Sequence, residues 1–425
     1  MHYTLKYKNL NLVVFRIKTV YVDKCVFNKM YVEHLPLPLK RLLKKGQFEE
    51  FILDENELFY ELNEDGCTLF DIWLANREIP VNRFHYSEYI SKTSTPRQWL
   101  LKNNGYSFTD SYWIESEEGI KEWDGILDIR RTLDTFYLTK DKNNRYKGHT
   151  STLGGQLEKF WFNKNGEVYL CKKADPSYDI LIAREYIASM IYQKQGYKNF
   201  CEYKLLYKDN YIVGCICKNF IEEGQDLISA YDLLEEYNLT QSPNVWDYII
   251  EKANQYGLDK SIVSDYLDIQ IIVDFLISNR DRHQSNIAFI RDEDSGIIIK
   301  PAPIFDNGSS KYMEHQHPES LYRTTVNGLY NTEMECLQHV SNFNLIDISK
   351  LPKEEELRNT LESCQSVSPN RKDNLLTMYR DRVNFLKEIQ LIYNRRLNIK
   401  EFIQARVEQS HDLESEIFFD FAEDW

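Results

Sequence analysis

The sequence has no apolar run long enough to cross a membrane, and it has few cysteines. A bilayer-spanning helix needs about 20 mostly apolar residues, and no stretch of this 425-residue chain approaches that length. The eight cysteines form no C-x-x-C pair and have no histidines at zinc-ligand spacing. The apolar run near the N-terminus is too short for a signal peptide. We therefore expect a cytoplasmic protein with reduced cysteines and no membrane contact.

An excess of positive charge is also missing. The 66 acidic residues outnumber the 52 lysines and arginines, which gives a formal net charge of −14. This balance argues against direct binding of nucleic acid or of an anionic membrane as the main function. The 42% of hydrophobic residues, with 14% aromatic ones, is ample for globular folding. A chain of this length is expected to form two or three domains.

Residues 1–145 contain no motif to which we can assign chemistry. Alternating residues at 10–15 and 19–22 predict strands, and residues 39–51 predict a short basic helix. The large aromatic side chains of this part are expected in a core rather than on a binding surface. They include Trp73, Trp99, Trp113 and Trp123.

Polar, oxygen-bearing residues are concentrated at residues 278–310. The nearly continuous apolar run before them, residues 266–277, predicts a buried helix. Residues 287–290 and 297–299 predict two strands, and the turn residues between them predict a hairpin. Because a hairpin brings its ends together, Asn286 and Asp306 should lie side by side, with Asp281 on the same loop.

The spacing of these residues suits phosphoryl transfer. Asp281 and Asn286 form D-x-x-x-x-N, and Asp306 and Gly308 form D-x-G. In protein kinases the first Asp lies near the substrate hydroxyl, while the Asn and the second Asp bind Mg²⁺, a cation that prefers oxygen ligands. For D-x-x-x-x-N alone, an ordinary polar turn is equally favoured. The hairpin and the second motif make that alternative the weaker one.

Residues upstream supply groups that a phosphate needs. Adjacent Gly154 and Gly155 let the backbone approach a phosphate chain, and their N–H groups can form an anion-binding nest, although most Gly-Gly pairs are ordinary turns. Residues 168–173 predict a strand that ends in Lys172 and Lys173. These two lysines point to opposite faces, so strand alternation cannot decide which of them binds phosphate.

A helix is predicted at residues 181–195. Gly196 ends it, and Ser177 or Asp179 can cap its start. Glu185, in its second turn, could position a phosphate-binding lysine; alone, it is better explained as a solvated surface glutamate. Further helices are predicted at residues 227–237, 245–256 and 371–394, and another starts after Pro352.

The motifs resemble those of a known family. N-R-D-R-H-x-x-N followed by F-D-N-G-S-S is similar to the HipA-like serine/threonine kinases, the toxin kinases of bacterial toxin–antitoxin systems and their relatives. The D-R-H-x-x-N core also resembles the phosphoinositide kinases. S-x-x-G-x-Q at 151–156, aromatic-Leu-x-Lys at 169–172 and E-Y-x-A-S at 185–189 favour the HipA-like pattern, and the second of these selects Lys172 over Lys173.

The resemblance implies an α+β, two-lobed kinase-like fold with a mostly helical C-terminal lobe. The implied domains are an accessory N-terminal domain at 1–145, an N-lobe at 146–225 and a C-lobe at 226–425. It further implies transfer of the γ-phosphoryl group of MgATP to a protein hydroxyl, and a possible small antitoxin partner. A lipid or small-molecule kinase, or a nucleotide-binding module without catalysis, is the alternative.

The resemblance also assigns the site residues. Asp281 orients or deprotonates the hydroxyl, and Asn286 and Asp306 hold Mg²⁺. Ser151 matches the serine that is autophosphorylated in the founding toxin. The residues expected to bind ATP, the last two through their main chain, are Ser151, Gly154, Gly155, Gln156, Lys172, Glu185, Lys218 and Phe220.

Overall fold

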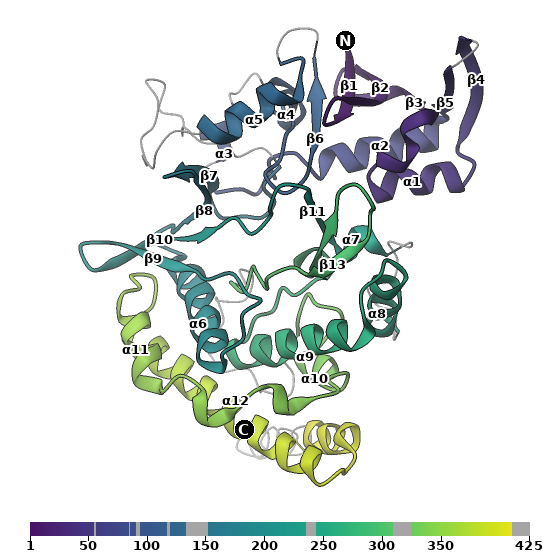
Figure 1. The fold of residues 1–425 in the computed structure, drawn as a ribbon. Coiled ribbons are helices and arrows are strands. Elements are labelled where there is room, and N and C mark those ends of the chain that lie inside the picture. The colour runs from purple at the N-terminus through teal and green to yellow at the C-terminus, as the bar shows by residue number, and fades with distance from the viewer. Residues whose placement is uncertain are drawn as a thin grey trace, which may run out of the picture. The chain divides into compact units, whose positions relative to one another are not determined.

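The computed structural model describes residues 1–54, 57–84, 86–90, 94–116, 120–132, 152–234, 244–308 and 325–409 (Figure 1). Contacts divide the chain into two compact units. The first unit comprises Met1–Asp175 and Ile216–Leu227, and the second comprises Pro176–Cys215 and Ile228–Trp425. The domain boundaries expected after residues 145 and 225 stay predictions.

A six-stranded antiparallel sheet opens the first unit, with the strand order β4-β5-β3-β2-β1-β6. Its strands are β1 (His2–Tyr7), β2 (Leu10–Lys18), β3 (Tyr21–Asn28), β4 (Phe48–Asp54), β5 (Glu57–Leu62) and β6 (Tyr112–Glu115). The helical elements of this part are η1 (Lys29–His34), α1 (Leu37–Lys44), α2 (Glu64–Ala75), α3 (Tyr86–Tyr89), α4 (Pro96–Lys102) and α5 (Trp123–Thr132). The strands predicted at 10–15 and 19–22 are confirmed within β2 and β3, although residues 19–20 form the turn between them.

The helix predicted at residues 39–51 is wrong in its second half, because α1 ends at Lys44 and β4 begins at Phe48. Gly46 has a φ of +67°, a left-handed conformation that ends the helix. Of the four tryptophans expected in a core, Trp113 and Trp123 are buried and pack in one aromatic cluster with Trp161. Trp73 and Trp99 are partly buried against two other clusters.

A second sheet has the strand order β7-β8-β10-β9. Its strands are β7 (Lys159–Lys164), β8 (Glu167–Lys173), β9 (Lys204–Lys208) and β10 (Tyr211–Lys218). Strands β7 and β8 form an antiparallel hairpin in the first unit, with Lys159 opposite Lys172. Strand β10 continues from the second unit into the first, because the division of the chain falls between Cys215 and Ile216.

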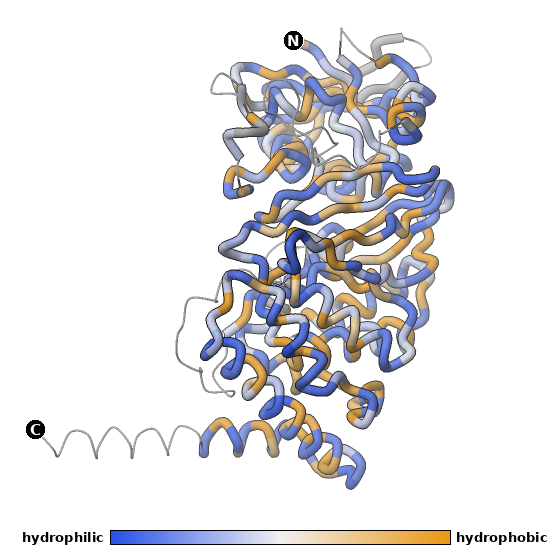
Figure 2. Tube along the Cα trace, turned by 90° about the vertical axis from the view of Figure 1, so that its left-hand side faces the viewer, coloured by the Kyte–Doolittle hydropathy of each residue, from blue (hydrophilic) through white to orange (hydrophobic). Residues whose placement is uncertain are grey.

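The second unit is mainly helical. Its labelled helices are α6 (Asp179–Gln195), α7 (Ala230–Leu233), α8 (Val245–Gln255), α9 (Lys260–Ile277), α10 (Glu333–Leu337), α11 (Glu354–Glu362) and α12 (Pro369–Asn394), with 3₁₀ turns η3 (Gln284–Asn286), η5 (Phe343–Leu345) and η6 (Ile348–Lys350). Residues 399–409 are also helical. A three-stranded sheet has the order β11-β12-β13, with β11 (Gln225–Ser229), β12 (Ala288–Asp292) and β13 (Ile298–Pro301). In Figure 2, hydrophobic and hydrophilic residues alternate along the last helical turns that are coloured, as expected for helices with one buried side.

Most of the predicted elements of this unit are confirmed: the buried helix before residue 278, the hairpin, and the helices α6, α8, α11 and α12. The helix predicted at residues 227–237 is wrong at its start, because β11 runs to Ser229. The Ser229 hydroxyl accepts from the Asp232 N–H and so caps α7, while the Ala230 N–H donates to the Ile287 carbonyl. None of the helices in the described parts of the chain has the length and hydropathy to cross a bilayer.

Candidate active site

Helix α9 places the loop that carries Asp281 and Asn286. Ser278 adopts a left-handed φ of 53° and ends the helix. The next residue, Asn279, folds back onto it: its main-chain N–H donates to the Asp274 carbonyl at 2.8 Å, and its side-chain amide donates to the Asp274 carboxylate at 2.8 Å. The loop is therefore wrapped around the buried carboxylate of Asp274.

One guanidinium joins this loop to the loop that contains Asp306. Arg282 binds the Asp274 carboxylate through Nε at 2.7 Å and Nη2 at 3.0 Å. Its Nη1 donates to the carbonyls of Asn286 (2.9 Å) and Phe305 (2.7 Å), and Nη2 also donates to Oδ1 of Asn307 (2.8 Å). The two loops thus come within reach of a single side chain that is only 2% exposed.

Electrostatics favour the charged form of Arg282. Burial acts to lower the pKa of its guanidinium, but the charge of Asp274 and the hydrogen bonds to it outweigh burial, and the pKa lies above its ordinary value. The guanidinium of Arg282 therefore stays charged in its contact with Asp274. Such a pair fixes the geometry of both loops.

Asp281 and Asn286 lie at the two ends of this loop. The side-chain amide nitrogen of Asn286 donates to the Asp281 carbonyl at 2.8 Å, which leaves its amide oxygen as the atom able to bind a cation. The Asp281 carboxylate has a side-chain exposure of 35% and accepts from the amide of Asn327 at 2.7 Å. His283 accepts the Ser285 N–H through Nδ1 at 3.2 Å, a contact that shapes the loop.

The loop of Asp306, Asn307 and Gly308 packs against helix α6. Asp306 has a φ of 55°, which is uncommon for a residue with a side chain. The Asn307 N–H donates to the Glu185 carboxylate at 2.8 Å. A Cβ on Gly308 would lie 2.6 Å from the Leu181 carbonyl oxygen and 3.3 Å from Cγ of Glu185, so glycine allows this close approach.

Glu185 is 1% exposed, and its interpretation as a solvated surface glutamate is wrong. Its described contact is with the Asp306 loop. Both ends of α6 are fixed within the second unit. At its C-terminal end, Gln195 exchanges two hydrogen bonds with the main chain of Asp347, at 3.0 and 2.8 Å.

The start of α6 differs from the prediction. Tyr178 occupies the N-cap position, and no side chain caps it, so the expected cap by Ser177 or Asp179 is wrong. The Asp179 carboxylate instead accepts from the Gln365 N–H and from the N–H and hydroxyl of Ser366. This carboxylate is fully buried. The longer-range contact therefore replaces the local cap.

In the first unit, the described part of the glycine turn is residues 152–156, and Ser151 lies outside the described residues. Residues 77–84 hold this turn. The Thr152 N–H donates to the Arg77 carbonyl at 3.0 Å, and the Phe84 N–H donates to the Gln156 carbonyl at 2.8 Å. The Arg83 guanidinium donates to the carbonyl of Gly154 at 3.1 Å and to that of Leu153. This segment, for which the sequence suggested no role, is thus a scaffold for the turn.

Gly155 has a φ of +84°, and a Cβ there would lie 2.8 Å from Nζ of Lys159. Of the two lysines at the end of β8, Lys172 is 2% exposed, whereas Lys173 forms an ion pair with Glu158. The environments of the two lysines therefore differ, as their opposite directions along the strand require.

Lys218 and Phe220 lie at and just after the end of β10, in the part assigned to the first unit. The Lys218 side chain is exposed and pairs with Glu167. Between them, the Asn219 N–H donates to the Val168 carbonyl at 2.8 Å, and the Asn219 side chain donates to the Phe108 carbonyl at 3.2 Å. Residues of the accessory region thus also support this segment.

Within the second unit, Arg282 connects the loop of Asp281 and Asn286 to the loop of Asp306. Asn327 binds Asp281, and Glu185 binds the loop of Asp306. The remaining predicted residues with described positions belong to the first unit: Gly154, Gly155, Gln156, Lys172, Lys218 and Phe220. Sequence reasoning missed Asp274 and Asn327. A signal existed for Asp274, because a carboxylate inside an apolar helix must be paired when buried.

The donor set fits a hard cation. A carboxylate from Asp306 and an amide oxygen from Asn286 are ligands that Mg²⁺ accepts, and Mg²⁺ usually takes only one or two carboxylates with phosphate and water oxygens. Among the residues that the structure describes, no group of three or more His, Cys, Asp or Glu side chains could hold a metal by itself.

By sequence, the chain is similar to a serine/threonine-protein kinase. This relative, CtkA of Helicobacter pylori, is 27% identical over 191 residues, which are 42% of this chain and 57% of that kinase. The match therefore spans just over half of the length of that relative. The crystal structure of the H. pylori proinflammatory kinase CtkA aligns with 62% of this chain and 95% of its own, at 20% identity and a TM-score of 0.41. No protein-family model matches the chain.

Proposed function

We propose that this protein is an ATP-dependent serine/threonine kinase of the HipA-like type, which transfers the γ-phosphoryl group of MgATP to a protein hydroxyl. The observation that carries the proposal is the convergence of two loops on Arg282, one with Asp281 and Asn286 and the other with Asp306. The distant similarity to a serine/threonine-protein kinase supports it. An antitoxin partner, toxicity and autophosphorylation of Ser151 are expected from the HipA-like resemblance alone, and a cytoplasmic location is expected from the cysteine pattern.

The roles of the acidic residues follow from their surroundings. The Asp281 carboxylate is more accessible than that of Asp274, with a side-chain exposure of 35%, so it can accept the proton of an incoming hydroxyl. Asp274, at 5%, is committed to Arg282 and acts by positioning. Asn286 and Asp306 hold Mg²⁺ in this proposal, and the bound ion would neutralise phosphate oxygens.

The lysine and the glycine turn complete the proposal. Lys172 binds phosphate oxygens, and the N–H groups of residues 154–156 cradle them. Main-chain groups near Lys218 and Phe220 bind adenine. Catalysis would then consist mostly of positioning and of charge stabilisation, because phosphoryl transfer needs little covalent help from the protein.

The test is transfer of label from γ-labelled ATP by the full-length chain to itself and to casein. Asp281→Asn keeps an acceptor for Asn327 but cannot take a proton, so we expect labelling to fall by about 10² or more. Labelling by Asp306→Asn should fall by a similar factor. Asp294→Asn, an exposed hairpin position of the same unit, is the matched control and should keep full labelling.

Two outcomes would contradict the proposal. Equal labelling by wild type and Asp281→Asn would remove the role of this carboxylate. Labelling of phosphoinositide vesicles but of no protein would instead favour the lipid-kinase alternative. Phosphoamino-acid analysis of labelled protein should find phosphoserine or phosphothreonine and no phosphotyrosine.

A further inference from the structure

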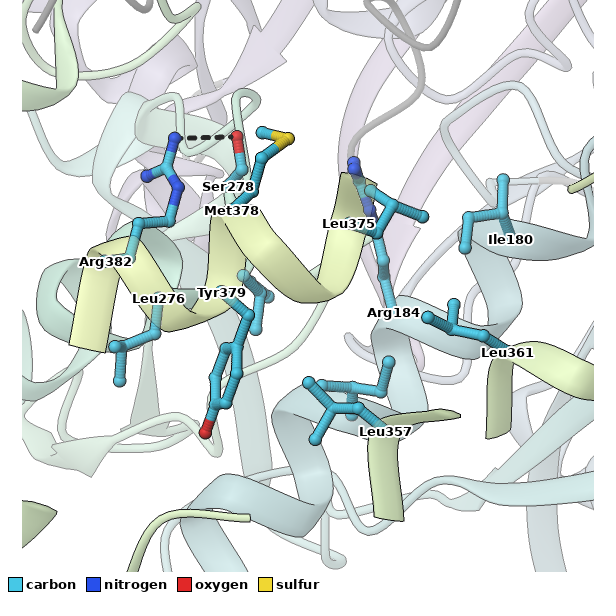
Figure 3. A pocket seen from close by; sticks show the side chains of 12 residues that line it. Ile180, Arg184, Leu276, Ser278, Leu357, Leu361, Leu375, Met378, Tyr379 and Arg382 are labelled. Atoms are coloured by element: carbon cyan, nitrogen blue, oxygen red, sulfur yellow. Dashed lines mark hydrogen bonds between the residues drawn. The ribbon is translucent and has the colours of Figure 1, made fainter. Parts of the chain in front are cut away.

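The second unit contains an apolar pocket between helix α6, the end of α9, and helices α11 and α12 (Figure 3). The space that a water-sized sphere can reach in it is about 50 Å³, and the pocket is open to solvent, so it is suited to a short chain or the edge of a ring and not to a folded domain. The apolar side chains on its walls include Ile180, Ile187, Leu276, Leu357, Leu361 and Leu375.

Two arginines line this pocket, and they differ in their contacts. Arg382 donates to the Glu333 carboxylate at 2.6 Å, to the Phe275 carbonyl at 2.7 Å and to the Ser278 hydroxyl at 3.3 Å. Arg184 is half-buried and forms no hydrogen bond or ion pair with any residue in the described ranges. The pocket thus combines apolar walls with one cation that the described protein does not neutralise.

The charges around Arg184 are mostly positive. Burial, together with the nearby guanidinium groups of Arg280, Arg371 and Arg382, lowers the pKa of Arg184 to about 10, while Glu333 opposes this shift. Arg371 precedes Leu375 by one turn of α12 and so lies on the same helix face. The Arg184 side chain remains protonated at neutral pH. A cation held among apolar groups and like charges is costly until an anion joins it.

We propose that this pocket binds a small amphipathic anion, an apolar ring or short chain bearing one carboxylate or phosphate, whose acid group pairs with Arg184. The aliphatic walls take the apolar part, and the planar guanidinium suits two oxygens of the acid group. Neither inorganic phosphate nor a neutral alcohol satisfies both parts of the pocket. Binding here does not depend on phosphoryl transfer by the chain.

The test is titration calorimetry of the full-length protein with octanoate, octyl phosphate, octanol and inorganic phosphate. We expect saturable binding of octanoate or octyl phosphate, with octanol and inorganic phosphate at least about tenfold weaker, since either lacks one of the two interactions. The stronger of the two acids tells whether the natural ligand carries a carboxylate or a phosphate. No saturable binding of either acid to wild type would overturn the proposal.

Variants locate the site. Arg184→Met replaces the guanidinium with an apolar side chain of similar length. The affinity for the acid should fall about tenfold or more, while octanol binding stays unchanged. The matched control is Arg380→Met, which lies on the same helix as Arg382 but forms an exposed ion pair with Glu354 outside the pocket. Equal affinities of wild type and Arg184→Met would overturn the assignment.

Two further variants keep the test decisive if Arg184→Met does not fold. Arg184→Lys keeps the charge but loses the planar fork, so the affinity for the acid should fall less than in Arg184→Met. Leu375→Phe, at a half-buried position of the wall, narrows the pocket and leaves the charge of Arg184 intact, so it should weaken the binding of both octanoate and octanol. Unchanged octanoate binding by both variants would place the ligand elsewhere. Far-UV circular dichroism reports whether each variant is folded.

Discussion

Replacing Arg282 by methionine tests the feature that joins the two loops of the candidate site. The change removes the partner of the Asp274 carboxylate, whose side chain is only 5% exposed. It also removes the donor to the carbonyls of Asn286 and Phe305. Asn279 keeps its hydrogen bond to Asp274, so the carboxylate retains one donor but no counter-charge.

The magnitude follows from burial. Breaking a buried ion pair from one side costs roughly 3–5 kcal/mol, because a charge is left unpaired. Each carbonyl that loses its buried donor adds about 1–3 kcal/mol, and the contributions are not additive. We take about 3 kcal/mol as the lower limit of the lost unfolding free energy. The unfolding free energy usually falls by about 1–3 kcal/mol per molar urea, so the urea midpoint should fall by about 1 M or more.

Urea unfolding followed by circular dichroism measures this change, and hydrogen exchange of residues 278–290 shows where it acts. The matched control is Arg358→Met, which breaks an exposed pair with Asp373 and should shift the midpoint far less. In the double variant Asp274→Leu with Arg282→Met, part of the loss should be recovered, because no unpaired charge remains. A midpoint for Arg282→Met equal to that of wild type would refute the reasoning.

Two further predictions concern the second unit. Gly308→Ala places a Cβ 2.6 Å from the Leu181 carbonyl oxygen, so the loop must move away from Glu185. Phosphate transfer should fall about tenfold or more, while the far-UV circular dichroism spectrum stays native. Full activity of this variant would contradict the close packing. Burial lowers the pKa of His339, which stacks on Tyr330 at 4.0 Å, below its ordinary 6.5. The unfolded chain therefore binds the proton first, and the stability from this group is present above pH 6.5 and lost on acidification. Between pH 7 and 5.5 the wild type should lose more stability than His339→Gln; equal losses would refute this.

The local elements of the fold could be read from the sequence. Helix α6 ends at Gly196, as expected, because glycine adopts the left-handed φ of 72° without a steric cost from Cβ. The hairpin of β12 and β13 was also predicted, because turn residues separate two short β-rich runs. Both signals lie within a few residues of the structure that they specify.

Elements that depend on distant partners were missed. The helix predicted at residues 227–237 overlaps strand β11, which runs to Ser229 and pairs in the sheet with β12. Asp179 looks like a helix cap, yet it binds residues 365 and 366, far along the chain. In both places a tertiary contact outweighs a local preference that is worth only about 1 kcal/mol.

In the candidate site too, some features could be predicted from the sequence and others depend on tertiary contacts. The sequence alone was enough to predict which residues would carry the chemistry, since the spacing of Asp281, Asn286 and Asp306 and the hairpin between them are properties of neighbouring residues. Only the tertiary structure decided that Arg282 pairs with Asp274, and that Glu185 meets Asn307 across 122 positions. A buried charge takes whichever partner the fold brings within about 3 Å, because leaving it unpaired costs more than any local preference, and no spacing along the chain encodes that distance.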